Sequence, residues 1–257
     1  DPDETAPPPT AAPTEPTSAP STAPSDQSTP STEAPASTEA PSTAPVASTT
    51  SAPPESTIAT TTEPDASPDD GYLPADLGTV VDSAPGVDSP GEVTELIDNV
   101  WFFVPSEPVE NDPNVVPPLP EDQAILIAYA EAQGAYHEQA SMNPIPAGAS
   151  ERLASSLADG GQRLVDNVLA PAAANGEYLD LSDGIVLRPV VIADPRSEDE
   201  AFIFDCQLDG TVFVNADGAL ADGQVPGVKE FPQIASVIRA DGVWTADRLT
   251  RDERACA

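Results

Sequence analysis

The sequence predicts an α+β domain that follows a long acidic tail. Residues 1–70 consist almost entirely of Pro, Thr, Ser, Ala and acidic residues, and they contain no aromatic side chain. After Pro120 the apolar residues recur with a helical period, and after Ile185 they fall into short strand-like segments separated by Asp-Gly turns. Helices followed by an antiparallel meander are typical of the α+β class.

Residues 1–70 are predicted to form a disordered tether. Their composition offers too little apolar surface to offset the entropy of ordering the backbone. The prolines remove amide donors and favour extended, solvated conformations over helix or sheet. A flexible chain of this length spans about 45 Å on average. The tail is therefore expected to act as a stalk.

The charge of the chain excludes several classes of partner. The formal net charge is −35, and no Lys or Arg precedes Arg152. Nucleic-acid binding requires clustered basic side chains, so we expect no nucleic-acid partner. Adsorption to anionic lipid is disfavoured by the same sign of charge. No apolar run approaches the ~20 residues that span a bilayer, so no transmembrane segment is expected in this chain.

The tail and the cysteines predict an exported protein. Because the chain begins with Asp1, we expect a leader peptide upstream, and a lipid-bearing cysteine there would fit a lipoprotein. Cys206 and Cys256 are the only cysteines, and they do not form a CxxC pair. A disulfide in an oxidising compartment explains them better than two free thiols. We therefore expect an extracellular or cell-surface protein whose partner is an unidentified protein or envelope component.

Residues 71–119 are predicted to be a linker that contains one apolar island, residues 93–104. Several of its residues lie at helical spacing, whereas residues 102–104 would also suit a short strand. The island could bind a partner from within a disordered linker. Alternatively, it could dock on the adjacent domain and bury Trp101 and Phe103. The second interpretation is favoured because isolated exposed apolar patches are rare on soluble proteins.

Residues 120–257 are predicted to form one domain that begins with helices. Ile125, Tyr129 and Tyr136 lie on one stripe of a helix that begins after Pro120. A second helix over residues 150–158 has Ser150 as its N-cap. A third covers residues 163–174, and Pro171 is expected to cut or kink it.

Strands are predicted for the remainder of the domain. They cover residues 185–193, 201–208, 211–215, 231–239 and 243–249. Pro189 requires an edge position or a bulge. In the second segment one face carries Phe202, Phe204, Cys206 and Leu208, and the opposite face carries Asp205 and Gln207. We expect the aromatic side chains to fill the core. Asp-Gly at residues 241–242 predicts a tight hairpin.

Residues 120–257 resemble a recurrent family of secreted or lipid-anchored actinobacterial proteins. The resemblance is carried by the tyrosine-bearing helix, Asp205-Cys206, TVFVNADG at 211–218, DGVW at 241–244 and the near-terminal Cys256. The folded part of those proteins resembles nuclear transport factor 2, in a superfamily with ketosteroid isomerase and SnoaL-like cyclases. The resemblance implies a curved antiparallel sheet wrapped over helices as a cone. It also implies a Cys206–Cys256 disulfide that pins the chain end to a central strand.

Enzymes of that superfamily place an acid–base residue at the open mouth of the cone. Tyr129, Tyr136 and His137 are the candidate pocket residues of this chain. His137 is the only histidine and has a suitable intrinsic pKa for a general base. The sequence offers it no partner, however, and residues 137–139 are typical of a solvated last helical turn. We therefore assign no catalytic residue, metal ligand or cofactor.

The sequence thus predicts an exported cell-envelope protein with a non-enzymatic, binding or structural role, in which a flexible stalk presents one folded domain. The alternative is a cone-pocket enzyme or small-ligand carrier of the ketosteroid isomerase or SnoaL type. A pocket that contains His137, or a buried lone carboxylate against Tyr129 or Tyr136, would favour this alternative. A cone filled by Phe and Leu side chains would exclude it.

Overall fold

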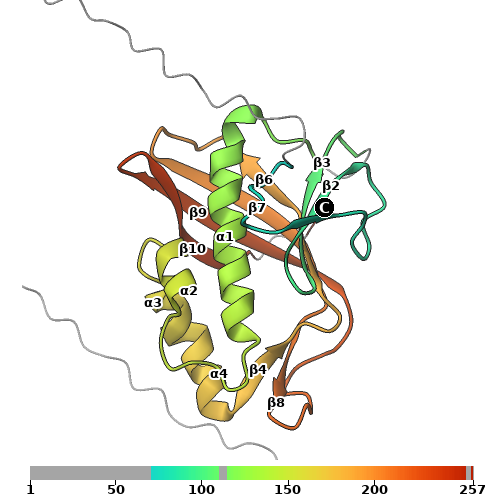
Figure 1. Cartoon of the computed structure of the whole chain (residues 1–257), viewed down its shortest axis with the longest axis vertical. Helices are drawn as coiled ribbons and strands as arrows, with labels where there is room; N and C mark the ends of the chain where they lie inside the picture. Colours follow the sequence, from blue (N-terminus) through green and yellow to red (C-terminus); the bar gives the residue numbers. More distant parts are fainter. Residues whose placement is uncertain (1–70, 110–114, 253–255, 257) are drawn as a thin grey trace, which may run out of the picture. The chain divides into compact units, whose positions relative to one another are not determined.

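The computed structural model describes residues 71–109, 115–252 and 256, so the tether predicted for residues 1–70 lies outside the described residues. The described chain forms an eight-stranded sheet, a two-stranded sheet and a small number of helices (Figure 1). All strand pairs but one are antiparallel, the exception being β3 with β5. The predicted α+β class is confirmed.

The eight-stranded sheet has the order β1-β2-β3-β5-β7-β9-β10, and β6 also pairs with β7. Its strands are β1 Thr79–Val81, β2 Gly91–Ile97, β3 Val100–Pro105, β5 Ile185–Leu187, β6 Pro189–Ile192, β7 Glu200–Asp209, β9 Lys229–Ala240 and β10 Val243–Arg251. The smaller sheet pairs β4 Glu177–Asp180 with β8 Val212–Asn215. Pro189 is tolerated because β6 pairs only with β7, as expected for an edge strand. The tight hairpin is also confirmed, with Asp241 and Gly242 at positive φ between β9 and β10.

The helices follow the predicted order. A 3₁₀ turn, Pro120–Asp122, leads into the long helix α1, Gln123–Ala140. Helix α2, Glu151–Ser156, begins at Ser150, whose Oγ accepts a hydrogen bond from the Leu153 amide at 3.2 Å.

The third predicted helix is continuous but irregular. It consists of α3 Gln162–Leu164, a π-helical turn Val165–Leu169 and α4 Ala170–Asn175. The π turn ends two residues before Pro171, whose missing amide hydrogen removes one regular helical bond. The kink expected at this proline therefore takes the form of a π turn.

Residues 71–119 differ from the expected linker, because they supply strands β1 to β3 of the main sheet. The apolar island is the β2–β3 hairpin, and Asn99 in its turn adopts a φ of 65°. Parallel pairing of β3 with β5 joins this hairpin to the rest of the sheet. Phe102 and Phe103 are buried and Trp101 is half-buried. The aromatic run therefore forms a strand, since sheet pairing satisfies its backbone while both faces bury side chains.

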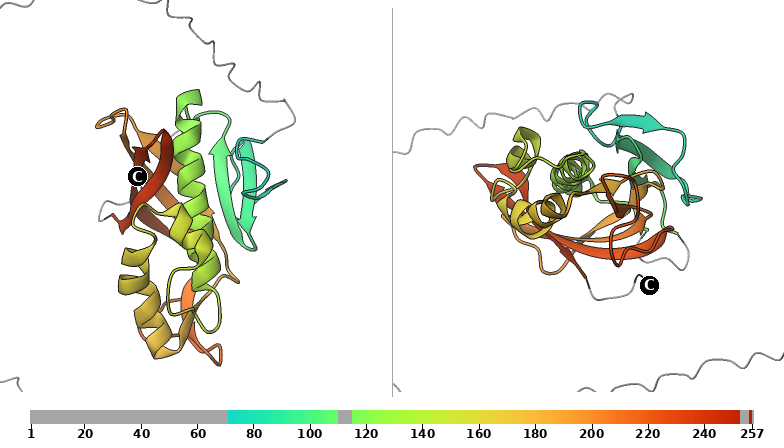
Figure 2. Two further views of the ribbon diagram at one scale, coloured as in Figure 1. Left: turned by 60° about the vertical axis from the view of Figure 1, so that its left-hand side comes forward. Right: turned by 90° about the horizontal axis from the view of Figure 1, so that it is seen from below.

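Helix α1 lies against one face of the main sheet. Seen along the helix, the sheet curves around it from the β2–β3 side to β10, and α2–α4 lie beside it (Figure 2). The main core fills the space between α1 and the sheet, and includes Phe102, Leu126, Tyr129, Leu187, Ile203 and Val237. A second apolar cluster lies between the end of α1, α2, the π turn and β4. No helix of the described residues is both long and apolar enough to cross a membrane.

Removing one aromatic ring from the hairpin tests whether it belongs to the domain. Phe102 is completely buried, so Phe102→Ala should lower the free energy of unfolding by about 3 to 5 kcal/mol in urea denaturation. Val80→Ala in the same region is the matched control, because Val80 is 54 % exposed and its truncation should have little effect. An unchanged stability of Phe102→Ala would mean that the hairpin is not part of the cooperative unit.

Candidate ligand-binding cavity

The face of β7 that meets α1 carries Asp205 and Gln207 beside apolar residues. Ala201, Ile203 and Asp205 are almost completely buried on this side, whereas Phe202 and Phe204 on the opposite side are half-buried. The expectation that the aromatic residues of β7 fill the core is therefore wrong. The inversion is possible because Tyr129 on α1 supplies a hydrogen bond to Asp205, which a purely apolar helix face could not do.

Asp205 is the centre of a buried hydrogen-bond network. Its Oδ2 accepts from the Tyr129 hydroxyl at 2.6 Å and from Gln207 Nε2 at 3.2 Å. Its Oδ1 accepts from the backbone amide of Arg188 at 2.7 Å. Burial raises the pKa of Asp205 from 3.8 to about 6, although these hydrogen bonds lower it in part. The carboxylate is thus ionised at neutral pH with three donors around it.

The ionised Asp205 dictates how its neighbours place their hydrogens. A carboxylate can only accept, so the single hydroxyl hydrogen of Tyr129 points to Asp205. The Tyr129 oxygen then accepts from Gln133 Nε2 at 2.7 Å. This fixes the amide of Gln133 with its nitrogen toward Tyr129 and its oxygen away from it. Oε1 of Gln133 is buried and has no hydrogen-bond partner among the described residues.

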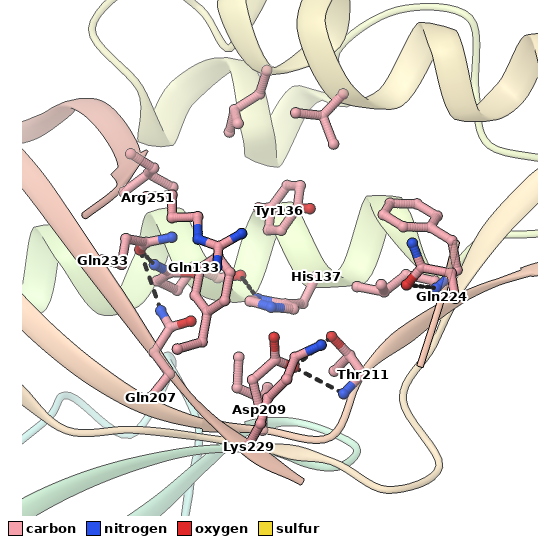
Figure 3. A pocket seen from close by; sticks show the side chains of 17 residues that line it. Gln133, Tyr136, His137, Gln207, Asp209, Thr211, Gln224, Lys229, Gln233 and Arg251 are labelled. Carbon is pink, nitrogen blue, oxygen red and sulfur yellow. Dashed lines mark hydrogen bonds between the residues drawn. The ribbon is translucent and has the colours of Figure 1, made fainter. Parts of the chain in front are cut away.

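Gln133 also lines a cavity of about 390 Å³ beside this network (Figure 3). The cavity lies between the C-terminal half of α1, the α3 and π-turn segment, the small sheet and strands β7, β9 and β10. Its apolar lining comprises Leu164, Val168, Leu179, Ile185, Phe213, Phe231 and Leu249. Its polar lining comprises Gln133, Tyr136, His137, Gln207, Asp209, Thr211, Gln224, Lys229, Gln233 and Arg251. It therefore combines apolar walls with a set of hydrogen-bonding groups.

His137 lines this cavity and is only 4 % exposed, so the expectation of a solvated last turn is wrong. The turn is covered because the neighbouring Gln139 side chain bonds the backbone of the following loop, at Gly148 O and Ser150 N, both at 2.8 Å. Nδ1 of His137 lies 2.8 Å from the Gln133 carbonyl oxygen. Since a carbonyl only accepts, Nδ1 carries the hydrogen and Nε2 of the neutral ring keeps its lone pair. Burial lowers the pKa of His137, which keeps the ring neutral.

Asp209 is the carboxylate that lines the cavity. Its Oδ1 accepts from the amide and the hydroxyl of Thr211, at 2.8 and 2.7 Å. Within the described part of the chain, Oδ2 has no hydrogen-bond partner. Burial and the charge of Asp209 raise the pKa of Tyr136 to about 12, so this phenol stays protonated. Lys229 on β9 stands opposite Asp209 in the strand register.

The structure thus brings two of the three candidate pocket residues, Tyr136 and His137, to the cavity. Tyr129 lies behind it, in the core, as part of the Asp205 network. Asp209 and Gln133 also line the cavity but were not predicted from the sequence. A usable signal for Gln133 was its position one helical turn after Tyr129, on the same buried stripe.

Comparisons with known proteins do not supply a function. No protein-family model, curated protein sequence or solved structure matches the chain. The resemblance to nuclear transport factor 2 therefore stays a prediction, and what the cavity can bind follows from its own atoms.

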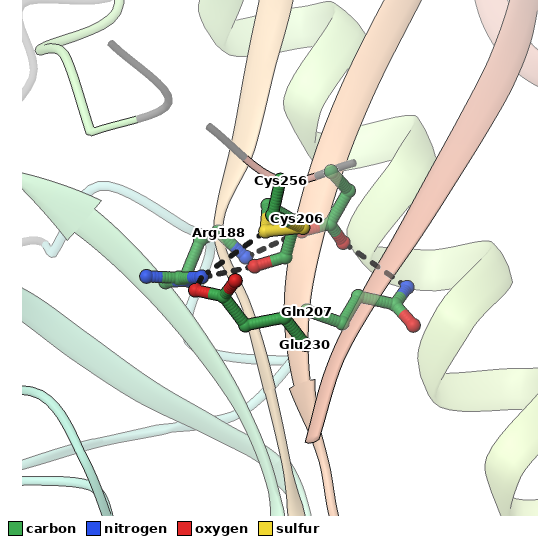
Figure 4. The surroundings of a disulfide bond; sticks show 6 residues. Arg188, Cys206, Gln207, Glu230 and Cys256 are labelled. Atoms are coloured by element: carbon green, nitrogen blue, oxygen red, sulfur yellow. Dashed lines mark hydrogen bonds and ion pairs between the residues drawn. A yellow bond between two sulfur atoms is a disulfide. The ribbon is translucent and has the colours of Figure 1, made fainter. Parts of the chain in front are cut away.

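The disulfide between Cys206 and Cys256 is present as predicted, on the opposite side of β7 from Asp205 (Figure 4). Arg188 braces it, because its Nε donates to the Cys206 carbonyl at 2.6 Å and its guanidinium lies 3.2 Å from the Cys206 sulfur. The Glu230 carboxylate lies close to both sulfurs. Cys206, Glu230 and Cys256 form the one group of potential metal ligands found among the described residues. Sulfurs joined in a disulfide are not thiolates, so this group is not a metal site.

Loss of the disulfide should lower the free energy of unfolding of the domain. Cys206 and Cys256 are separated by 50 residues. In the chain-entropy model, Cys256→Ala should therefore lower the free energy of unfolding by about 4 kcal/mol. Dithiothreitol should bring the parent protein to the stability of the variant and leave the variant unchanged. A variant as stable as the parent would show that the bond does not constrain the unfolded chain.

The raised pKa of Asp205 makes stability depend on pH. The folded protein holds this proton to a higher pH than the unfolded chain, so the contribution of Asp205 is full below its unfolded pKa of 3.8 and is lost as pH rises through about 6. The parent should lose about 3 kcal/mol relative to Asp205→Asn over this interval in urea denaturation. Asp222→Asn, at an exposed site, should follow the parent. Parallel curves for the parent and Asp205→Asn would contradict the assignment.

Proposed function

We propose that this protein is an exported small-ligand-binding protein, in which an acidic stalk presents one disulfide-closed α+β domain. The observation that carries this proposal is the cavity, which contains His137 and lies beside the buried Asp205–Tyr129 pair. Both features were expected of a ligand-binding or enzymatic cone rather than of a filled core. They favour the small-ligand carrier over a purely structural role.

The size and lining of the cavity support a small organic ligand. Ligand pockets occupy about 300 to 1,000 Å³ and combine apolar walls with a few placed polar groups. The cavity of about 390 Å³ lies within this range. A buried polar atom without a partner, such as Gln133 Oε1, costs about 1 to 3 kcal/mol. A bound ligand that satisfies this atom would recover part of that free energy.

Two properties support export. The Cys206–Cys256 disulfide is of the kind that persists in oxidising compartments. The acidic Pro/Thr/Ser/Ala-rich composition of residues 1–70 suits a solvated stalk. We propose an extracellular or cell-surface location on these two grounds.

We also propose that residues 120–257 form a cone of the nuclear transport factor 2 type. The support is the long helix α1 against the curved sheet, with the cavity beside its C-terminal half. The β1–β3 segment and its parallel junction with β5 are additions to the antiparallel sheet that the resemblance implies.

Binding to this cavity can be tested with the uncharged fluorescent probe N-phenyl-1-naphthylamine. The full chain should enhance the fluorescence of the probe, because the cavity walls are apolar. Val168→Trp places a large side chain in the cavity and should weaken binding about tenfold or more. Leu220→Trp, at an exposed site outside the cavity lining, is the matched control and should bind like the parent. Failure to bind, or equal binding by Val168→Trp, would contradict the proposal.

His137 favours a second candidate function, proton transfer on the bound ligand. Its neutral ring presents an unprotonated Nε2 in the cavity, which is the state a general base requires. The carbon acid 2-tetralone in heavy water is a suitable probe, since exchange of its α-hydrogens can be followed by NMR. Exchange accelerated by the parent about a hundredfold over His137→Gln would support a base. Equal exchange rates would leave binding as the function.

A further inference from the structure

We infer that the ligand of this cavity is a neutral molecule with a hydroxyl group, which donates hydrogen bonds into the cavity while an apolar body packs against its walls. The inference rests on the proposed binding function and specifies the class of ligand. It is drawn from the hydrogen-bonding atoms that the cavity-lining side chains leave without partners.

Three such atoms are hydrogen-bond acceptors. They are Oε1 of Gln133, Nε2 of His137 and Oδ2 of Asp209, and none has a hydrogen-bond partner among the described residues. They come from α1 and the end of β7, two elements that face one another across the cavity (Figure 3). A ligand placed between them meets acceptors on both sides.

Hydrogens on the same side chains are already donated within the protein. The Gln133 amide nitrogen donates to the Tyr129 oxygen and to Gln233 Oε1, and His137 Nδ1 donates to the Gln133 carbonyl. The Tyr129 hydroxyl cannot turn toward the cavity while Asp205 is ionised, because Asp205 holds its only hydrogen. The hydrogens that satisfy these three acceptors must therefore come from the ligand, whose oxygen can in turn accept from donors of the lining such as the Tyr136 hydroxyl. A buried site built to bond a hydroxyl strongly rejects an analogue that lacks it, since its acceptors are then left unsatisfied.

The charges around the cavity select a neutral donor. An ammonium group would pair with Asp209, but Lys229 and Arg251 also line the cavity. One acidic and two basic side chains give the lining a formal charge of +1, which disfavours a cation. Lys229 is the only lysine of the sequence and stands opposite Asp209. A carboxylate placed against Asp209 and two further acceptors would be repelled. A hydroxyl satisfies acceptors without introducing a charge that the cavity must neutralise.

The apolar walls determine the rest of the ligand. Leu164 and Val168 come from the α3 and π-turn segment, whereas Phe231 comes from β9 and Leu249 from β10, the strand that also carries Arg251. The Arg251 guanidinium lies 5.1 Å from the Phe231 ring centroid, so this cation makes a cation–π contact with an apolar residue of the cavity wall. An alicyclic or aromatic body carrying one or two hydroxyl groups fits this combination.

The decisive comparison is between 2-naphthol and 2-methoxynaphthalene, whose ring and oxygen are shared but whose O–H donor is not. Binding of each to the full chain is measured by NMR titration at neutral pH, with chemical shifts used to locate the probe. The inference predicts that 2-naphthol binds about tenfold more tightly. 2-Naphthoate tests the competing anionic class, for which Lys229 and Arg251 would be responsible.

Two variants and a control identify the acceptors responsible. His137→Phe retains a planar ring but removes Nε2, and it should bring the two affinities within about threefold of each other. Gln133→Met removes the Gln133 Oε1 acceptor at similar volume and should also reduce the preference for 2-naphthol. It tests the inference independently if His137→Phe does not fold. Gln224→Met changes a polar cavity residue whose oxygen bonds the Phe213 amide, and it should keep the preference of the parent.

The outcomes separate this inference from the proposed function. Equal binding of 2-naphthol and its methyl ether in the cavity, or tighter binding of 2-naphthoate, would overturn the hydroxyl-donor class and leave a ligand-binding cavity in place. A naphthol preference that survives both His137→Phe and Gln133→Met would overturn the assigned acceptors. Absence of cavity binding by all three probes would overturn both proposals.

Discussion

The hydrogen bond between the Tyr129 hydroxyl and Asp205 joins the long helix to the sheet through the centre of the core. Asp205 is 1 % exposed, and an isolated carboxylate at such a depth would be strongly destabilising. It is tolerated because Tyr129, Gln207 and the Arg188 amide all donate to it. If any one of these donors is removed, the buried charge of Asp205 loses a hydrogen bond that water cannot replace. The position of α1 along β7 is therefore fixed by the need to place the Tyr129 hydroxyl at Asp205.

The same contact links the core to the cavity. Asp205 fixes the direction of the Tyr129 hydroxyl hydrogen, and the Tyr129 oxygen fixes the orientation of the Gln133 amide. Gln133 Oε1 is then left beside the cavity without a hydrogen-bond partner among the described residues. Behind Asp205, the disulfide of Cys206 and the guanidinium of Arg188 hold the other side of the strand. Gln207 and Asp209, two of the polar residues of the cavity, therefore project from a strand that is fixed on both faces. Such rigidity favours a binding site whose geometry exists before the ligand arrives.

Periodicity and turn chemistry predicted much of this fold. The stripe of Tyr129 and Tyr136, the Ser150 cap and the Asp241-Gly242 hairpin depend on neighbours in the sequence, and all three are present. The β2–β3 hairpin was predicted less well because its partner, β5, lies far along the chain and no local pattern reveals that pairing. The orientation of β7 was missed for a related reason, since only a distant tyrosine makes a buried Asp205 acceptable. Tyr136 and His137 could be named in advance, but the acceptors around them depend on a chain of long-range hydrogen bonds.

The most direct measurement of the central contact is the titration of the Asp205 carboxyl in the folded protein, followed by its Cγ chemical shift in NMR spectra. A carboxylate that is buried beneath α1 and bonded to Tyr129 should titrate with a pKa of about 6. The midpoint should move in Tyr129→Phe, because that variant removes the hydroxyl donor. A midpoint near the ordinary value of 3.8 that is the same in both proteins would show that water reaches Asp205, and would contradict this account of the core and of the cavity beside it.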